Sequence, residues 1–272
     1  VAHVYRAATW AAARGFGLHD RGLVAPGQRA DLVLLHDLAD CAVAGVVKDG
    51  RVVGPHSFAG RTAPAAVGLD SVRLDPVTAG DFAVPAGGAS RPVIGILPGK
   101  IITEHLTLEV PRRGAVAVAD PERDILKVCV LARHGTNRNI GRGFVRGFGF
   151  ARGAIASSVG HDSHNVCVVG ADDSDMAVAV NRLIALQGGF VAVRDGQVIG
   201  EIALPLAGLM SLEPFETVAV QLRTLREAVR GMGCPLAEPF LQLAFLPLPV
   251  IPHLKITDHG LVDVDRFAVI AA

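Results

Sequence analysis

The chain has 272 residues, half of them hydrophobic, and its 26 basic and 26 acidic residues give a formal net charge of zero. This balance excludes the basic field that attracts nucleic acid or anionic lipid, so we expect neither nucleic acid nor membrane as a partner. The four cysteines form no CxxC pair, which is typical of a reducing compartment, and we expect a cytoplasmic protein without disulfides.

The first residues predict a helix. Residues 1–16 carry small apolar side chains at helical spacing, and Gly15 and Gly17 end the pattern. A helix so rich in alanine suits tight packing against a large body. We therefore expect residues 1–17 to be the last helix of a barrel whose other parts precede this chain.

The next segment, residues 18–60, predicts a few short strands. An apolar strand follows Asp31, and Asp49-Gly50 is typical of a hairpin turn. The string from Gly22 to Val33 resembles the segment with which metal-dependent hydrolases of the amidohydrolase superfamily leave their barrel and begin a small β-sandwich. The resemblance implies that residues 18–60 belong to such a sandwich.

A change of composition divides the rest of the chain. Residues 61–90 are rich in proline, glycine and alanine, and we expect a linker with one short strand at 72–74. From residue 91 onward, apolar runs, helical periodicity and an Asp195-Gly196 hairpin signal predict a separate α+β domain over 91–272. It should contain a mixed or antiparallel sheet. The elements expected there are strands at 93–97, 101–110, 125–132, 190–193 and 197–202, and main helices at 173–187 and 214–230.

The densest polar stretch of the chain is the run from Ser157 to Asn165, which places two imidazoles, a carboxylate, three hydroxyls and an amide in nine residues. A buried polar group without a partner costs about 1–3 kcal/mol, so the run predicts a loop at the edge of a cleft. The alternative is a turn whose polar side chains bond their own backbone. Both readings stay open. The candidate catalytic residues are His161, Asp162, His164 and Asn165, and the candidate substrate-binding residues are Ser157 and Ser158.

Two other chemistries are weaker alternatives for this run. His161 and His164 have a spacing that suits Zn²⁺, with His134 as the nearest third ligand. A triad of Ser158, His161 and Asp162 lacks the G-x-S-x-G context of a nucleophile elbow.

A glycine- and arginine-rich segment covers residues 141–149. Its spacing matches neither a phosphate-binding loop nor a dinucleotide fingerprint. Flexible backbone near a cleft or a close-packed strand is the favoured interpretation. Asn137, Arg138 and Asn139, just before it, are candidates for contacts with the sandwich or the barrel.

Four long strings together resemble one family. They occur in order at residues 96–104, 141–149, 152–165 and 205–211, and they are similar to the C-terminal domain of bacterial adenine deaminases, amidohydrolase-type enzymes that convert adenine and water to hypoxanthine and ammonia. The likeness extends from residue 1 to about residue 263. It implies an α+β chain, with part of an amidohydrolase β-sandwich followed by an α+β C-terminal domain, and a (β/α)₈ barrel in the full-length protein.

The resemblance also implies what this chain lacks. The family holds its two-metal centre in the barrel with a His-x-His pair, further histidines and carboxylates, and no His-x-His occurs in these 272 residues. We therefore expect a divalent metal (Mn, Fe or Zn) bound by the barrel, no metal ligands here, and no deamination by this chain alone. The implied substrate is adenine, in purine salvage, and the implied partners are the protein's own N-terminal barrel and further copies in a homo-oligomer.

Two functional hypotheses from different classes remain open. In the first, the 161–165 loop borders the barrel mouth and shapes a purine pocket. In the second, the domain is a structural and oligomerisation module of an amidohydrolase-type hydrolase, and its loop meets another subunit. Other amidohydrolases, such as hydantoinases or dihydroorotases, lack a C-terminal domain with this string.

Overall fold

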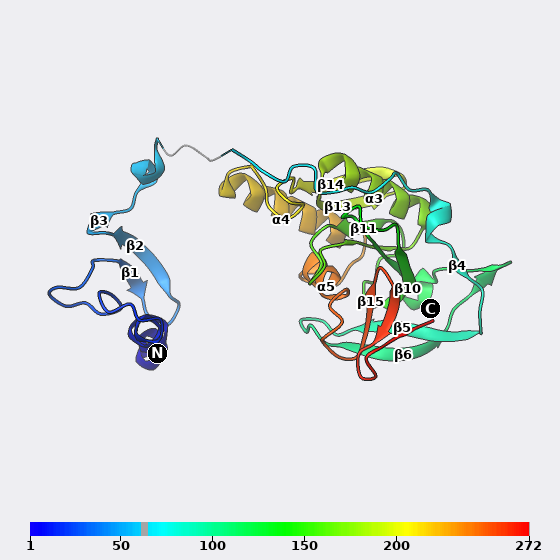
Figure 1. The fold of residues 1–272 in the computed structure, drawn as a ribbon, viewed down its shortest axis with the longest axis horizontal. Coiled ribbons are helices and arrows are strands. Elements are labelled where there is room, and N and C mark those ends of the chain that lie inside the picture. Colours follow the sequence, from blue (N-terminus) through cyan, green and yellow to red (C-terminus); the bar gives the residue numbers. More distant parts are fainter. Residues whose placement is uncertain (61–64, 272) are drawn as a thin grey trace. The chain divides into compact units, whose positions relative to one another are not determined.

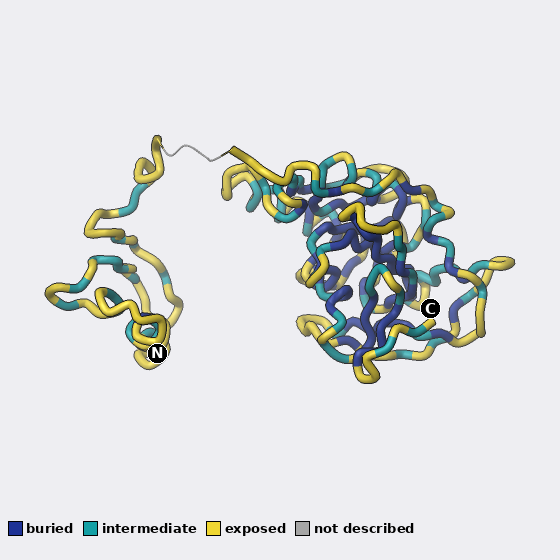
Figure 2. Tube along the Cα trace, viewed as in Figure 1, coloured by how far each residue is buried: buried dark blue, intermediate teal, exposed yellow. Residues whose placement is uncertain are grey.

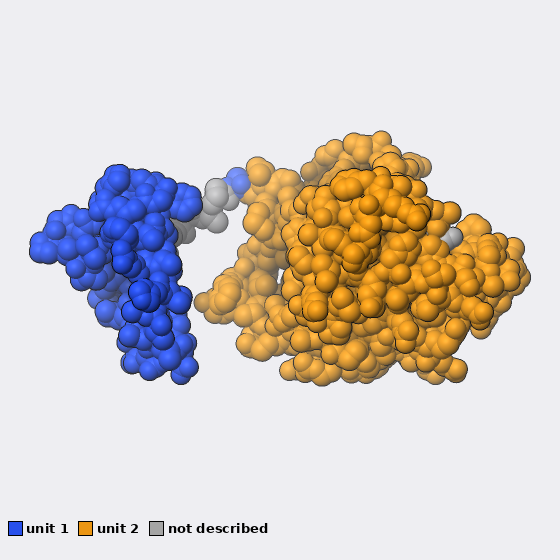
Figure 3. Space-filling model, turned by 90° about the horizontal axis from the view of Figure 1, so that it is seen from below, with its two compact units in different colours: residues 1–65 blue, residues 66–272 orange. Residues whose placement is uncertain are grey.

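The structure, a computed structural model, describes residues 1–60 and 65–271. The chain divides into two compact units, Val1–Ala65 and Ala66–Ala272 (Figure 3). Along the described ranges, no helix combines the length and the apolar character needed to cross a membrane.

The first unit begins with the expected helix, which is continuous through three assigned parts: α1 (Ala2–Arg6), a π-helical turn η1 (Ala7–Ala11) and α2 (Ala12–Gly15). Its small side chains allow a close approach of the following loop. A Cβ added at Gly22 would lie 2.8 Å from the Ala13 Cβ atom. The alanine-rich sequence thus fixes the packing of this loop on the helix.

A three-stranded antiparallel sheet completes the first unit, with β1 (Leu32–Asp37), β2 (Ala42–Lys48) and β3 (Arg51–Val52) in that order. The predicted hairpin connects β2 to β3. Asp49 and Gly50 both have positive φ values, 50° and 74°, as a two-residue hairpin turn of this kind requires. A short 3₁₀ helix, η2 (Pro55–Phe58), follows.

The second unit is built on an eight-stranded sheet with the order β14-β13-β11-β12-β9-β10-β5-β6 (Figure 1). All neighbouring strands are antiparallel except β10 and β5, which are parallel. The mixed sheet and the α+β class agree with the sequence prediction. The strands are β5 Ser90–Ile96, β6 Thr103–Glu109, β9 Ile125–Leu131, β10 Ile140–Arg146, β11 Ala154–Ser157, β12 Val166–Gly170, β13 Gly189–Arg194 and β14 Gln197–Ala203.

Both faces of this sheet are covered, as the buried central strands in Figure 2 show. Along β9, Leu126, Val128 and Val130 join one apolar cluster, whereas Cys129 and Leu131 join another. This alternation follows from the period of two in a β-strand. A strand buried on both faces is apolar at nearly every position, which explains the run at 125–132. The exception, Lys127, is buried and donates to the Phe82 carbonyl at 3.2 Å and to the Asp173 carboxylate at 2.7 Å.

Helices occupy both layers around the sheet. Helix α3 (Asp173–Leu186) packs on one face, while α4 (Phe215–Gly231) and α5 (Pro239–Phe245) contribute to the cluster on the other. The two main helices lie within a residue or two of the predicted positions. The short α5 was not predicted, because its proline-rich apolar sequence has no helical periodicity. A small sheet of β15 (Leu254–Thr257), β16 (Gly260–Asp263) and β17 (Ala268–Ile270) packs on the main sheet over β10, and β15 also contacts the end of α5.

The ends of α3 follow from its sequence. The Asp172 carboxylate accepts hydrogen bonds from the amides of Ser174 and Asp175 at 2.8 and 3.1 Å, which satisfies donors that a helix leaves free at its start. Gln187 ends the helix in the left-handed conformation, and Gly188 follows with a φ of 113°.

The structure changes the interpretation of residues 61–90. Residues 61–64 lie outside the described residues, but residues 66–90 belong to the second unit rather than to a linker. Val72 and Phe82 are buried, and residues 72–74 form no strand. The proline-rich composition hid this packing because extended segments without a sheet partner have no periodic pattern. The segment contains the 3₁₀ helix η3 (Ala79–Phe82) and the strand β4 (Val84–Pro85). Strand β4 pairs with β8 (Val116–Ala117), which also pairs with β7 (Arg112–Arg113), in a small three-stranded sheet. Another 3₁₀ helix, η4 (Pro121–Arg123), precedes β9.

The glycines of residues 141–149 serve close packing in strand β10. A Cβ added at Gly141 would lie 1.8 Å from the Thr257 carbonyl oxygen, and one at Gly143 would lie 2.8 Å from the Leu261 side chain. Of the two interpretations favoured from the sequence, the structure supports the close-packed strand. Its glycines let β15 and β16 lie directly on the main sheet.

Candidate functional site

The polar run 157–165 connects β11 to β12 at one end of the main sheet. The strand register places the end of β11 beside the start of β13, and the start of β12 beside the end of β9. The loops after β9 and β14 therefore meet the run at the same end. This convergence brings together residues that are up to 74 positions apart, as Arg133 and Ala207 are.

Ser157 and Ser158, the candidate substrate-binding residues, are fully buried. The Ser157 hydroxyl bonds the backbone of Val159 at 2.9 and 3.0 Å. The Ser158 hydroxyl donates to the Gly208 carbonyl at 2.6 Å and accepts from the Gly189 amide at 2.8 Å. Ser158 therefore holds the loop to its neighbours in this chain, whereas Ser157 stabilises the turn of the loop itself.

Asn165 is also buried, and its side-chain oxygen accepts a hydrogen bond from the Arg133 backbone amide at 3.3 Å. It therefore attaches the end of the loop to the segment that follows β9. Of the six candidates, Asp162 is exposed and His161 and His164 are half-buried, so these three residues reach the surface of the loop.

Arg133 is a central residue of this region that sequence reasoning missed. Its side chain is only 1% exposed. The guanidinium donates to the carbonyls of Ser71, at 2.9 Å, and Ala207, at 3.0 Å, to the Ser71 hydroxyl at 3.1 Å, and to the His164 carbonyl. Burial lowers its pKa. The sequence did offer one signal, because Arg133 follows the apolar run 125–132. A cation buried at such a position needs several hydrogen-bond acceptors around it.

These contacts make Arg133 the common support of three segments. Ser71 belongs to the first segment of the second unit, His164 to the candidate loop, and Ala207 to the loop after β14. The fixed fork of an arginine suits several carbonyl acceptors at once, which a lysine does not reproduce. The candidate loop is therefore held at a defined position by the rest of the unit.

His161 is held by helix α5. Its backbone amide donates to the Ala244 carbonyl at 2.9 Å, and its ring lies 4.8 Å from the Phe245 ring, centroid to centroid. The Phe245 carbonyl in turn accepts a hydrogen bond from the buried Lys255 ammonium at 3.1 Å. Burial lowers the pKa of Lys255 to about 8. A second buried cation thus supports the loop through α5.

His164 has a defined place inside the loop. Its φ of 51° is left-handed, and its backbone amide donates to the Gly160 carbonyl at 2.6 Å. The ring Nδ1 lies 3.3 Å from the Gly160 amide nitrogen. Desolvation, followed by the charges of His161 and Arg133, lowers its pKa, so the neutral imidazole is favoured at pH 7.

The alternative chemistries are not supported by this geometry. Within the described part of the chain, no group of three or more His, Cys, Asp or Glu side chains is placed to hold a metal ion. His134 instead contacts the Ser163 carbonyl through Nε2 at 2.7 Å. The proposed zinc site of His134, His161 and His164 is therefore wrong. The Ser158 triad is also wrong, because that hydroxyl is buried and bonded to backbone groups.

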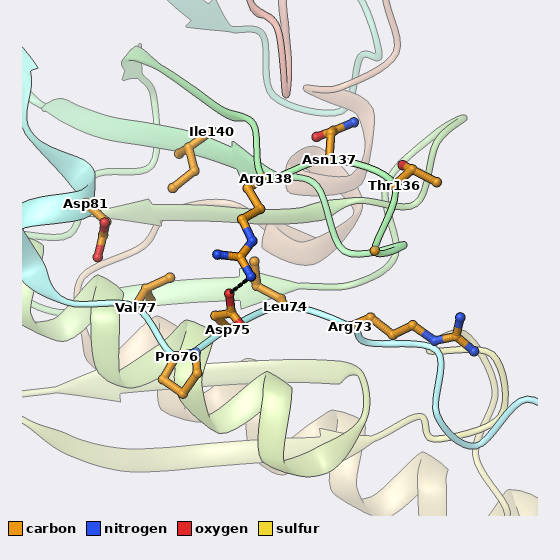
Figure 4. Close-up of a pocket in the computed structure, with 11 residues that line it drawn as sticks. Arg73, Leu74, Asp75, Pro76, Val77, Asp81, Thr136, Asn137, Arg138 and Ile140 are labelled. Carbon is orange, nitrogen blue, oxygen red and sulfur yellow. Dashed lines mark ion pairs between the residues drawn. The ribbon is translucent and has the colours of Figure 1, made fainter.

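A polar pocket of about 470 Å³ lies beside the segment that follows Arg133 (Figure 4). Arg138 and Asp75 meet across it in an ion pair at 2.8 Å. Both side chains are largely exposed, and such a pair contributes little to stability. The pocket contains Asn137 and Arg138 from the set that we expected to contact the sandwich or the barrel. Its other lining residues are Arg73, Leu74, Pro76, Val77, Asp81, Gly135, Thr136 and Ile140.

Comparison with known proteins places these features in a family. Residues 100–268 match the family described as "Adenine deaminase C-terminal domain", and residues 1–53 match the "Amidohydrolase family". The first match covers more than half of the chain and contains the 157–165 run. The chain therefore belongs to the adenine deaminase C-terminal domain family.

Several relatives that align with nearly the whole chain are named adenine deaminase. The chain is 64% identical over 263 residues to the adenine deaminase of Methylobacterium nodulans, and 60% identical over 267 residues to adenine deaminase 1 of Agrobacterium fabrum. It is 60% identical over 261 residues to the adenine deaminase of Gluconobacter oxydans. These alignments cover 96%, 98% and 96% of this chain but 46% of each relative. The chain spans about half the length of these curated relatives.

Proposed function

We propose that the chain is the C-terminal part of an adenine deaminase, which converts adenine and water to hypoxanthine and ammonia. The observation that carries this proposal is the match over nearly the whole chain to proteins named adenine deaminase, at 58–64% identity. The direct test is ammonia release from adenine by the full-length protein that contains this sequence. A full-length protein that binds metal and folds but releases no ammonia would contradict the proposal.

The catalytic metal, in this proposal, is a divalent ion such as Mn, Fe or Zn, held by an N-terminal barrel. The described residues of this chain do not fit such a centre, because they offer no group of three ligands. We therefore derive no chemical step through a metal here. The 272-residue chain by itself should release no ammonia from adenine when Mn²⁺, Fe²⁺ or Zn²⁺ is supplied, and release at an enzyme-like rate would overturn this assignment.

The barrel is also the proposed partner of the first unit. Among residues 1–60, Ala13 is the only hydrophobic side chain that is buried within the chain. Exposed apolar patches of this kind mark interaction surfaces, and the match of residues 1–53 to the amidohydrolase family supports a barrel as the occupant. The large exposed side chains are Val1, Val4, Phe16, Leu18, Leu23, Val24, Val33, Leu34, Leu38, Val43, Val46, Val52 and Phe58.

The candidate loop, in the same proposal, borders the mouth of the barrel, where (β/α)₈ active sites are built. His161, Asp162 and His164 supply the outward groups, while Ser157, Ser158 and Asn165 hold them in place. The buried supports of the loop favour this role, because a site needs its groups to be pre-positioned. We further propose a cytoplasmic homo-oligomer that acts in purine salvage.

The competing function is a structural and oligomerisation module whose loop meets another subunit. His161→Ala and His164→Ala in the full-length protein separate the two. A loss of tenfold or more in kcat/KM, which is about 1.4 kcal/mol of transition-state stabilisation, with unchanged metal content and melting temperature, supports a place in the site. Unchanged kinetics, or loss of the assembled oligomer, supports the structural role.

A further inference from the structure

The hydrogen bond between Gly160 and His164 determines which ring nitrogen of His164 carries the proton. A backbone N–H only donates, so the Nδ1 atom that lies 3.3 Å from the Gly160 amide nitrogen must accept. In a neutral imidazole, the other nitrogen then carries the hydrogen. Among the described residues, Nε2 of His164 has no hydrogen-bond partner, and the side chain is partly exposed.

The surroundings of the ring favour the neutral state. The charged or titratable groups that act on it are His161, Arg133, Asp162 and His134. Burial and the positive groups lower the pKa of His164 below its ordinary value, and Asp162 opposes them with a smaller effect. Asp162 is itself exposed, so water screens its charge.

The backbone around His164 is fixed as well. The guanidinium of Arg133 donates to the His164 carbonyl, and the His164 amide donates to the Gly160 carbonyl. The left-handed backbone of His164 is therefore held from both sides, and the Gly160 amide orients the ring through its hydrogen bond to Nδ1.

We propose that His164 is a pre-positioned neutral donor, whose Nε2–H binds an uncharged acceptor of a purine, such as a ring nitrogen or a carbonyl oxygen. This inference rests on the proposed function, and it assigns the loop a binding chemistry that excludes a general base at Nε2. Arg133 is a positioning residue for that donor.

The protonation state is tested on the 272-residue chain itself. Nitrogen NMR of the histidine rings at pH 7, with His164 assigned by its loss in a His164→Asn variant, should show an unprotonated Nδ1 and a protonated Nε2. A ring with hydrogen on Nδ1, or on both nitrogens, would overturn the inference and leave the adenine deaminase assignment intact.

The role of the donor is tested by two variants in the full-length protein with adenine as the probe. His164→Asn suits the left-handed backbone and keeps an oxygen for the Gly160 amide, but it has no donor at the Nε2 position. His164→Gln places an amide N–H₂ near that position. We expect kcat/KM to fall at least about tenfold for His164→Asn and to stay within about threefold for His164→Gln.

Controls make each outcome decisive. His259→Asn changes an exposed histidine outside the loop and should leave kcat/KM unchanged, and melting temperature and metal content are measured for every variant. Equal losses in the Asn and Gln variants would overturn the donor role. Unchanged kinetics in both, with wild-type protein active on adenine, would overturn the donor role and the position of the loop at the site together.

Discussion

Replacement of Arg133 by methionine tests whether one buried cation holds the candidate loop. Methionine keeps an unbranched apolar stem but removes every donor, so the carbonyls of Ser71, His164 and Ala207 lose their hydrogen-bond partner. A buried acceptor left without a partner costs about 1–3 kcal/mol, which sets an upper limit of about 9 kcal/mol for the gross loss from three carbonyls, and water reduces it because these hydrogen bonds are only partly buried.

A second effect opposes this loss. Arg133 is a buried cation with only carbonyl and hydroxyl partners among the described residues, and desolvation of such an ion costs several kcal/mol. Methionine removes that cost. The two effects together predict a net destabilisation of about 3 kcal/mol. Lysine keeps the desolvation cost without the fork, so Arg133→Lys should be destabilised by a similar or larger amount.

The assay is urea unfolding of the 272-residue chain, followed by far-ultraviolet circular dichroism, which reports the secondary structure of the chain, most of which lies in the second unit. Hydrogen exchange should accelerate in residues 66–74, 158–165 and 204–210, and not in β5. Arg152→Met is the control, because Arg152 is 78% exposed and its nitrogen lies 3.8 Å from the Asp195 carboxylate; it should change stability by less than about 0.5 kcal/mol. An Arg133→Met protein as stable as wild type, with unchanged exchange, would refute the reasoning.

Three further predictions concern buried groups of the second unit and the exposed thiol. The pKa of Lys255 falls from 10.5 to about 8 on folding, so the folded state binds fewer protons than the unfolded state between these pH values. The free energy of unfolding should therefore rise with pH across this window, by up to about 3 kcal/mol relative to Lys255→Met. Parallel pH profiles of the two proteins in urea unfolding would contradict this. Gly188→Ala should destabilise the protein by more than about 2 kcal/mol, because its Cβ would lie 2.5 Å from the Gly208 Cα atom at a φ of 113°, and thermal unfolding measures the change. Cys41 is exposed, whereas Cys129 and Cys167 are buried, and burial raises the pKa of the Cys129 thiol to about 12. A thiol reagent should therefore label Cys41 rapidly in native protein, and it should label Cys129 and Cys167 only after denaturant is added.

The sequence alone determined the elements with strong local signals. Strand β9 is apolar at every position except Lys127, α3 has an aspartate cap and a glycine stop, and the Asp49-Gly50 turn has its own backbone preference. Each signal is contained in a few neighbouring residues, so it needs no knowledge of the fold. The four long strings likewise identified the family, because they depend on order along the chain and not on contacts.

The tertiary structure decided which side chains of the 157–165 run face outward. Ser157, Ser158 and Asn165 have the same polar character as His161 and His164, so composition alone could not separate the buried supports from the outward groups. Ser158 and Asn165 bond Gly208, Gly189 and Arg133, up to 50 residues away, whereas Ser157 bonds the nearby Val159. Arg133 itself lies 62 residues from Ser71 and 74 from Ala207. Such contacts depend on how the strands are ordered in the sheet, and a local pattern of residues does not determine that order.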